Sequence, residues 1–411
     1  MSVEQMGTAT AAEVLVVQTE REVSVDQPRH AKEIGKRALE LDGFMVLEMA
    51  KSPYEHVRRE LESKVVDQPD AIDAIIEAIE RSSVRLDSDH RPLANLAFLG
   101  PTGVGKSETA KVLSKRMIEG ESNLIKIDCS SFANGHEVMS LIGSPPSYVG
   151  HEQTPYFAKS NVEQPGTVVL FDEVEKGSEK LYNLMLQIMG DGLLRLNNGD
   201  LVSFRDTIVI LTSNLGAKEM SAQLSPTRLG FTEKDRATDK DGLEKVARRS
   251  FTEFFTPEFT NRLNKMVVFH SLGEEALGKV LDVKLAEANE DYERQYGVRI
   301  SLSEATKSEL VSIAAEEPHL GARPLVRALE NNVQTTFGRY NTSNVISEGT
   351  HIRVVHRNEL SDPDVYASDS PFIFTAKADR TIRKQTPPLA IEAAAAHEQD
   401  IEPEPDEEIE E

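Results

Sequence analysis

One short run has the residue types and spacing of a phosphate-binding loop. GPTGVGKS, from Gly100 to Ser107, fits the pattern G-x-x-x-x-G-K-[ST] and lies between an apolar run and a helical one. Its glycines let backbone N–H groups turn toward phosphate oxygens, its lysine supplies a cation for the β- and γ-phosphates, and its serine is a magnesium ligand. The run predicts an ATP site lined by Gly100, Pro101, Thr102, Gly103, Val104, Gly105, Lys106, Ser107 and Glu108.

Two further runs place polar groups after apolar strands. VVLFDE, residues 168–173, ends in adjacent carboxylates, which are costly to bury unless a cation accompanies them. We expect Asp172 to hold Mg²⁺ together with Ser107, and Glu173 to polarise the water that attacks ATP. Asn214, which ends ILTSN, is a candidate to orient that water, although an asparagine after a strand is also a common turn former.

Alternating apolar and helical runs predict the fold that positions these groups. Residues 93–100, 124–129, 166–173 and 206–214 are typical of buried strands, and residues 107–117 are typical of a helix. Buried strands separated by helices favour an α/β fold with a parallel sheet flanked by helices. Ile72, Ile75, Ile76 and Ile79 form one apolar helical stripe before the first of these strands.

The patterns divide the chain into four parts. Residues 1–61 are expected to be an N-terminal extension, with little order to about residue 30 and a helix from about residue 31 to residue 62. Residues 62–270 form the large nucleotide-binding domain, and residues 271–357 form a smaller, mostly helical domain with an extended stretch at 351–356. Residues 358–411 are expected to be a disordered acidic tail, which carries ten carboxylates and no lysine or arginine after residue 391.

Composition narrows the function classes. The net charge of −23 and the pI near 5.0 argue against nucleic acid as a partner. No apolar run is long enough to span a membrane, and no signal peptide is expected at the N-terminus. Cys129 is the one cysteine, which suits a reducing compartment, so the expected location is cytoplasmic.

From about Val65 to His356 the chain resembles the second ATPase module of the Clp unfoldases, the AAA+ proteins of the ClpB, ClpC and ClpA type. The segments that carry the resemblance occur in the family's order: VVDQPDAI, RPLANLAFLGPTGVGKSE, SYVGHE, LFDEVEKG, FRDTIVILTSNLG, PEFTNRLNKMVVFH and GARPLVRALE. It implies an AAA+ sheet followed by a helical lid, and a homo-hexameric ring that hydrolyses ATP and pulls unfolded or tagged proteins through a central pore. The first ATPase module and the long coiled coil of such proteins are not found in this sequence.

The resemblance gives roles to residues that are otherwise unremarkable. Arg262 matches the arginine finger that reaches a neighbour's γ-phosphate, Arg323 matches sensor 2 on the lid, and Asn214 matches sensor 1. Val65 and Val66 would line the adenine pocket. From the residues alone, both arginines would be read as ordinary surface arginines; a finger or sensor is electrostatically sensible, because an added cation stabilises charge on the transferring phosphoryl group.

Two loops would face partners. Tyr148, with Val149 and Gly150, resembles the pore loop that grips the threaded chain, although Ser147 stands where the family usually has glycine and HEQTPYF replaces its acidic, glycine-containing continuation. Leu229, Gly230 and Phe231 resemble the loop that docks a Clp-type peptidase, and an ordinary surface loop remains the alternative there.

Two other functions compete with that of an unfoldase. A scaffold whose nucleotide site regulates assembly would hydrolyse ATP without unfolding anything. A DNA-directed AAA+ protein fits poorly, because the sequence offers no basic groove and that function leaves the Tyr148 loop unexplained.

Overall fold

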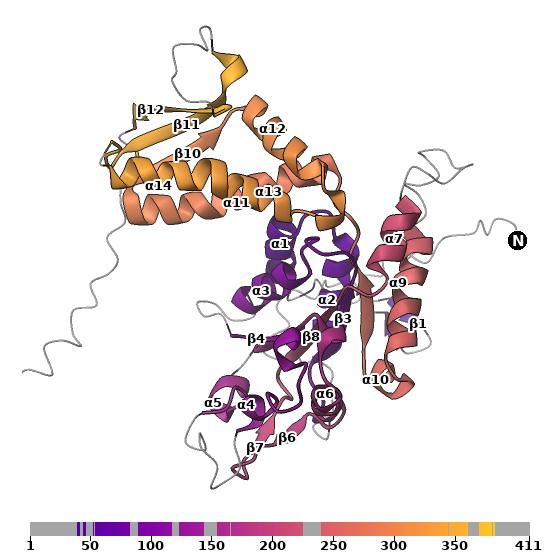
Figure 1. Ribbon diagram of the computed structural model, residues 1–411. Coiled ribbons are helices and arrows are strands. Elements are labelled where there is room, and N and C mark those ends of the chain that lie inside the picture. Colours follow the sequence, from indigo (N-terminus) through magenta and orange to yellow (C-terminus); the bar gives the residue numbers. More distant parts are fainter. Residues whose placement is uncertain are drawn as a thin grey trace, which may run out of the picture.

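The computed structural model describes residues 39–41, 44–46, 52, 54–82, 89–116, 123–143, 154–164, 166–224, 240–343, 345–360, 370–379 and 381–382. Most of them form a large α/β domain with a smaller domain beside it, shown in orange and yellow (Figure 1). Within these ranges, no helix combines the length and apolar character that a membrane span requires.

The large domain is built on a parallel sheet of five strands in the order β4-β5-β8-β3-β9. The four strands expected from the sequence are present, and the fifth, β9, was not predicted. Their bounds are β3 Ala94–Leu99, β4 Leu124–Asp128, β5 Val168–Asp172, β8 Ile208–Ser213 and β9 Lys265–Val268. Because β5, β8 and β3 are adjacent and parallel, their carboxyl ends meet at one edge of the sheet.

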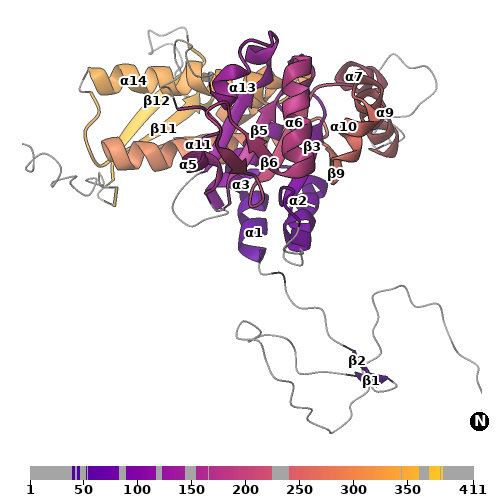
Figure 2. The ribbon, with the colours of Figure 1, turned by 90° about the horizontal axis from the view of Figure 1, so that it is seen from below.

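Helices cover both faces of this sheet (Figure 2). Leu96 and Phe98 of β3 pack with α1, α2 and α3 on one face, whereas Ala97 and Leu99 pack with α6, α9 and α10 on the other. The helices are α1 Glu55–Lys64, α2 Pro69–Ser82, α3 Lys106–Arg116, α4 Met139–Ile142, α5 Lys159–Val162, α6 Glu179–Asp191, α7 Ala217–Leu224, α9 Lys240–Phe254 and α10 Pro257–Asn261. A hairpin of β6 Leu193–Arg195 and β7 Leu201–Ser203 extends the domain.

The smaller domain combines helices with a three-stranded sheet. Its helices are α11 Glu274–Tyr296, α12 Glu304–Ala315, α13 Arg323–Leu329 and α14 Thr335–Thr342, and a π-helical turn at Glu330–Gln334 joins the last two. Its strands are β10 Val298–Leu302, β11 Thr350–His356 and β12 Phe372–Ala378. The mostly helical lid is confirmed, but only β11 of the three strands was expected.

The N-terminal expectation of a helix from about residue 31 to residue 62 is wrong in its middle part. Residues Leu39–Leu41 (β1) and Phe44–Val46 (β2) pair as an antiparallel hairpin, and the helix begins only at Glu55. The Asp42-Gly43 pair between apolar alternations is a hairpin signal that the helical interpretation overlooked.

The expectation of disorder beyond residue 357 is also wrong in part. Strand β12 pairs antiparallel with β11 over seven residues, from Phe372 opposite His356 to Ala378 opposite Thr350. Phe372 is 3% exposed and belongs to the lid core. Three apolar residues at the start of the strand, Phe372, Ile373 and Phe374, are buried or half-buried and hold it in the lid.

We expect Phe372→Ala to lower the free energy of unfolding by about 3 kcal/mol, because it leaves a cavity in the lid core. Lys377→Ala, at an exposed position of the same strand, should change it by less than about 0.5 kcal/mol. Urea unfolding followed by circular dichroism measures both. Equal midpoints for the two variants would show that β12 is not part of the cooperative lid core.

Candidate active site

The predicted phosphate-binding loop connects β3 to α3 in a conformation that needs its glycines. Gly100, Gly103 and Gly105 have φ values of 137°, 74° and 101°, in the region that disfavours other residues. A Cβ on Gly100 would lie 2.4 Å from the carbonyl oxygen of Phe269. The loop therefore depends on close backbone contacts that side chains would block.

Lys106 lies beneath this loop and is 6% exposed. Its Nζ donates hydrogen bonds to the carbonyl oxygens of Gly100 at 2.6 Å and Pro101 at 2.5 Å, and to Asn214 Oδ1 at 2.9 Å. Burial disfavours the charged form and lowers the pKa of Lys106 to about 8, although nearby carboxylates oppose the shift. The ammonium is thus held where phosphate oxygens would relieve its desolvation.

Asp172, at the end of β5, accepts hydrogen bonds from two hydroxyls. Ser107 Oγ lies 2.7 Å and Thr212 Oγ1 2.6 Å from its Oδ1, and Lys126 Nζ lies 2.8 Å from Oδ2. Burial alone would raise the pKa of Asp172, but the bonds from Lys126, Thr212 and Ser107 outweigh it and hold the pKa below its usual value. The adjacent hydroxyl and ionised carboxylate of Ser107 and Asp172 are oxygen donors that fit Mg²⁺.

Glu173 follows Asp172 with an unusual backbone. Its φ of 54° lies in the left-handed region, which costs a non-glycine residue conformational energy. Its N–H donates to Thr212 Oγ1 at 2.9 Å, and its carboxylate contacts Lys176 and accepts a bond from Asn214 Nδ2 at 3.4 Å. The backbone turn thus places the carboxylate at the sheet edge beside the candidate water-orienting residue.

Asn214 links the cation to the candidate base. Its Oδ1 accepts from Lys106, its Nδ2 donates to Glu173, and its backbone N–H donates to Glu175 Oε1 at 3.0 Å. Thr212 and Lys126 are the members of this network that sequence reasoning missed. Lys126 had a usable signal, because it is a charged residue within the apolar run of β4.

The lid contacts the loop directly. The backbone N–H of Ala322 donates to the carbonyl oxygen of Gly103 at 2.9 Å, and a Cβ on Gly321 would lie 2.6 Å from the same oxygen. Arg323 begins α13 next to this contact; it is exposed, and its charge is among the causes that lower the pKa of Lys106. The structure therefore brings the predicted sensor 2 to the site.

The other predicted nucleotide contacts lie where the two domains meet. Val65 packs in the core beneath the sheet, and Val66 packs against the lid core. Glu108, in the first turn of α3, pairs with Lys284 of α11 at 2.9 Å. A ligand bound where the two domains meet would therefore contact both of them.

Arg262 does not join the site of its own chain. It follows α10, its carbonyl accepts from Asn95 Nδ2 at 3.0 Å, and its guanidinium packs against Gly190 and lies 3.8 Å from Glu258. Asn95 is the second residue of β3, at the end opposite the loop. Tyr148, Val149 and Gly150, and also Leu229, Gly230 and Phe231, lie outside the described residues.

Family comparisons match both domains. Residues 91–266 match the AAA domain (Cdc48 subfamily), and residues 272–354 match the C-terminal D2-small domain of ClpB protein. The first match ends within β9, and the second begins two residues before α11.

Curated relatives carry corresponding names. Chaperone protein ClpB of Wolinella succinogenes is 35% identical over 297 residues, which cover 72% of this chain and 33% of that protein. The ATP-dependent Clp protease ATP-binding subunit ClpC of Staphylococcus saprophyticus is 34% identical over 296 residues, covering 72% and 36%. The chain thus spans about a third of the length of these relatives.

The lowered pKa of Lys106 predicts that ATP binding weakens as the pH rises above about 8. The free protein loses this proton in that range, whereas bound phosphates favour the ammonium, so binding takes up a proton. Calorimetry from about pH 7 to about pH 10 should show the affinity falling by up to about tenfold per pH unit.

Lys106→Arg is the matched control for this titration. A guanidinium keeps its charge throughout the range, so the variant should bind ATP more weakly but with little dependence on pH. Equal slopes for the wild type and the variant would contradict the assignment of the proton to Lys106.

Proposed function

The chain belongs to the AAA ATPases of the Clp type, and from that premise we propose that it is a subunit of an ATP-driven protein unfoldase. The observation that carries the proposal is the hydrogen-bonded network that joins Lys106, Asn214 and Glu173 at the carboxyl edge of the sheet. In this network the cation of Lys106 can bind phosphate, and the amide of Asn214 can orient a water molecule. The carboxylate of Glu173 can then accept a proton from that water.

In the proposed reaction, Lys106 donates to phosphate oxygens instead of to the carbonyls of its own loop. Ser107 and Asp172 would hold Mg²⁺, which neutralises charge on the β- and γ-phosphates when bound. Glu173 takes a proton from the attacking water. The oxygen of that water bonds to the γ-phosphorus as the bond to ADP breaks and ADP leaves. Asn214 orients that water, and Arg323 adds positive charge from the lid.

We further propose that Arg262 completes the site of a neighbouring subunit in a homo-hexameric ring. Its contacts with Asn95 and Gly190 hold it at the opposite end of β3 from the loop, and its side chain is 39% exposed. A partly exposed arginine that is separated from its own site is available to a second copy. A closed ring gives every subunit such a neighbour.

Arg262→Ala should lower ATP turnover by about 10³-fold or more while leaving nucleotide binding largely intact. Glu173→Gln should also be inactive. Mixing the two should restore activity, to about a quarter of wild type for random rings, because the Arg262→Ala subunit keeps its base and receives a finger from its neighbour.

Arg249→Ala is the control for Arg262→Ala, because Arg249 is exposed and pairs only locally with Glu253 among the described contacts. It should hydrolyse ATP normally. Normal turnover in Arg262→Ala, or no recovery on mixing with Glu173→Gln, would reject the shared site.

The unfolding step is proposed for the loop that carries Tyr148, Val149 and Gly150. An aromatic side chain can grip unfolded or tagged polypeptides through apolar contact without selecting one sequence. The relatives named as a chaperone and as the ATP-binding subunit of a protease support a protein substrate. In this proposal the AAA domains of the subunits form a single ring.

The test is ATP-dependent unfolding of a tagged fluorescent protein by Tyr148→Ala and by Tyr156→Ala. Tyr156 is the control, since it is 56% exposed and lies just beyond the same loop. Both variants should hydrolyse ATP, and only Tyr148→Ala should fail to extinguish the fluorescence. If the wild type hydrolyses ATP normally but unfolds nothing, a nucleotide-regulated scaffold becomes the better function.

Leu229, Gly230 and Phe231 are proposed as the docking loop for a Clp-type peptidase. The printed name of the ClpC relatives, an ATP-binding subunit of a protease, supports this assignment. An ordinary surface loop remains its alternative, and the unfolding activity does not depend on it.

A further inference from the structure

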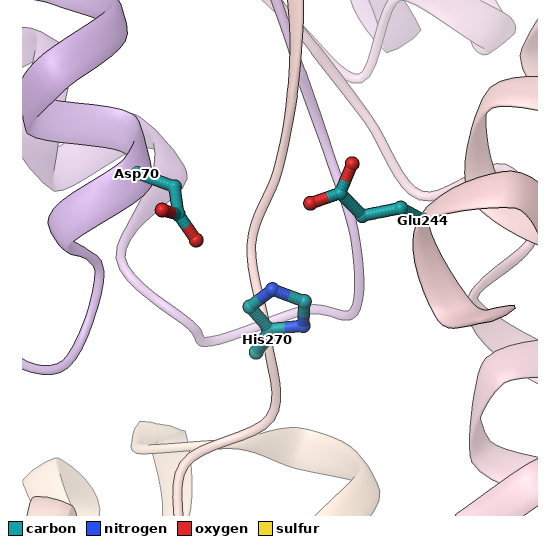
Figure 3. A group of neighbouring side chains, drawn as sticks. All are labelled: Asp70, Glu244 and His270. Carbon is teal, nitrogen blue, oxygen red and sulfur yellow. The ribbon is translucent and has the colours of Figure 1, made fainter. Parts of the chain in front are cut away.

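Three potential metal ligands from distant parts of the sequence converge outside the nucleotide site. Asp70 lies in the first turn of α2, Glu244 in α9, and His270 directly after β9 (Figure 3). One carboxylate oxygen of Asp70, one of Glu244 and one ring nitrogen of His270 lie within 4.8 Å of one another. The imidazole lies between the two carboxylates, which come from opposite sides.

A side-chain bridge and core packing position the three residues. Gln68, which is 3% exposed, donates from Nε2 to the carbonyl oxygen of His270 at 3.0 Å and accepts from its N–H at 3.2 Å. This side chain ties His270 to the start of α2, two residues before Asp70. Glu244 lies on α9 next to Leu243, which is 8% exposed and packs in the core.

The charges at this position require compensation. Two carboxylates this close repel each other unless a positive charge lies between them. Glu244 has a nearby cation in Arg248, at 3.4 Å, whereas Asp70 forms no ion pair with any residue in the described ranges. The space between His270 and the two carboxylates is therefore a favourable place for a cation.

We propose that Asp70, Glu244 and His270 bind a divalent metal ion of the Zn²⁺ class. One imidazole nitrogen with two carboxylate oxygens suits Zn²⁺, whereas Mg²⁺ prefers oxygen ligands alone. Asp70 is exposed and the other two residues are half-buried, so an ion can enter from solvent. The site does not depend on the proposed unfoldase function.

Bound metal would act on the segment that joins the two domains. His270 lies between β9, the last strand of the large domain, and α11, which begins the lid at Glu274. An ion shared with α2 and α9 would cross-link this segment to the large domain at two points. Metal binding would thereby restrict the movement of the lid.

The experiment uses the full chain freed of metal with a chelator and titrated with Zn²⁺ alone in excess Mg²⁺. The excess Mg²⁺ occupies the oxygen site at Ser107 and Asp172. The heat measured on adding Zn²⁺ therefore comes from binding at Asp70, Glu244 and His270. We expect one Zn²⁺ per chain in calorimetry, and a loss of affinity of at least about tenfold in Asp70→Asn and in Glu244→Gln.

Glu253→Gln is the matched control, since Glu253 lies on α9 with Glu244 but nine residues away, where it pairs with Arg249. It should bind Zn²⁺ like the wild type. Zn²⁺ should also raise the thermal midpoint of the wild type and of this control, but not of Asp70→Asn.

Two results would overturn the proposal. One is a wild type that binds no more Zn²⁺ than the double variant Asp70→Asn/Glu244→Gln. The other is a control that loses as much affinity as the two ligand variants.

Discussion

The burial of the Lys106 ammonium is the constraint on which the rest of the site depends. A buried cation is costly unless polar acceptors surround it, and here two loop carbonyls and the Asn214 amide supply them. Gly100, which supplies one of those carbonyls, has a φ of 137° that other residues rarely adopt. Since the same amide also reaches Glu173, the positions of the cation, the water-orienting group and the candidate base are coupled.

The sheet explains why these groups meet at one edge and Arg262 at the other. Both faces of β3 are covered by apolar side chains, so charged groups are confined to its ends. The phosphate-binding loop follows the carboxyl end of this six-residue strand, and Asn95 holds the Arg262 carbonyl near the amino end, about 20 Å away. In the proposed ring, one chain would present two halves of a site that it cannot close alone.

Sequence reasoning recovered what local patterns encode. The GPTGVGKS run, the acids after β5 and the isoleucine stripe of α2 each carry a period or a spacing that predicts an element or a group at its end. The missed features depend on long-range pairing: β12 is held by β11 and the lid core, and Thr212 enters the site only because β8 lies beside β5. Gln68 carried no signal either, since its partner is a backbone 202 residues away.

The contacts between the large domain and the lid offer a physical reason why nucleotide binding would affect the lid. Val65 packs under the sheet while its neighbour Val66 packs against the lid, so the proposed adenine pocket spans both domains. At the phosphate end, the Gly103 carbonyl accepts a hydrogen bond from Ala322 of the lid. A nucleotide bound there would therefore lie against residues that themselves contact the lid, both at its base and at its phosphates. A change at the phosphates would therefore reach the lid through the hydrogen bond between Gly103 and Ala322.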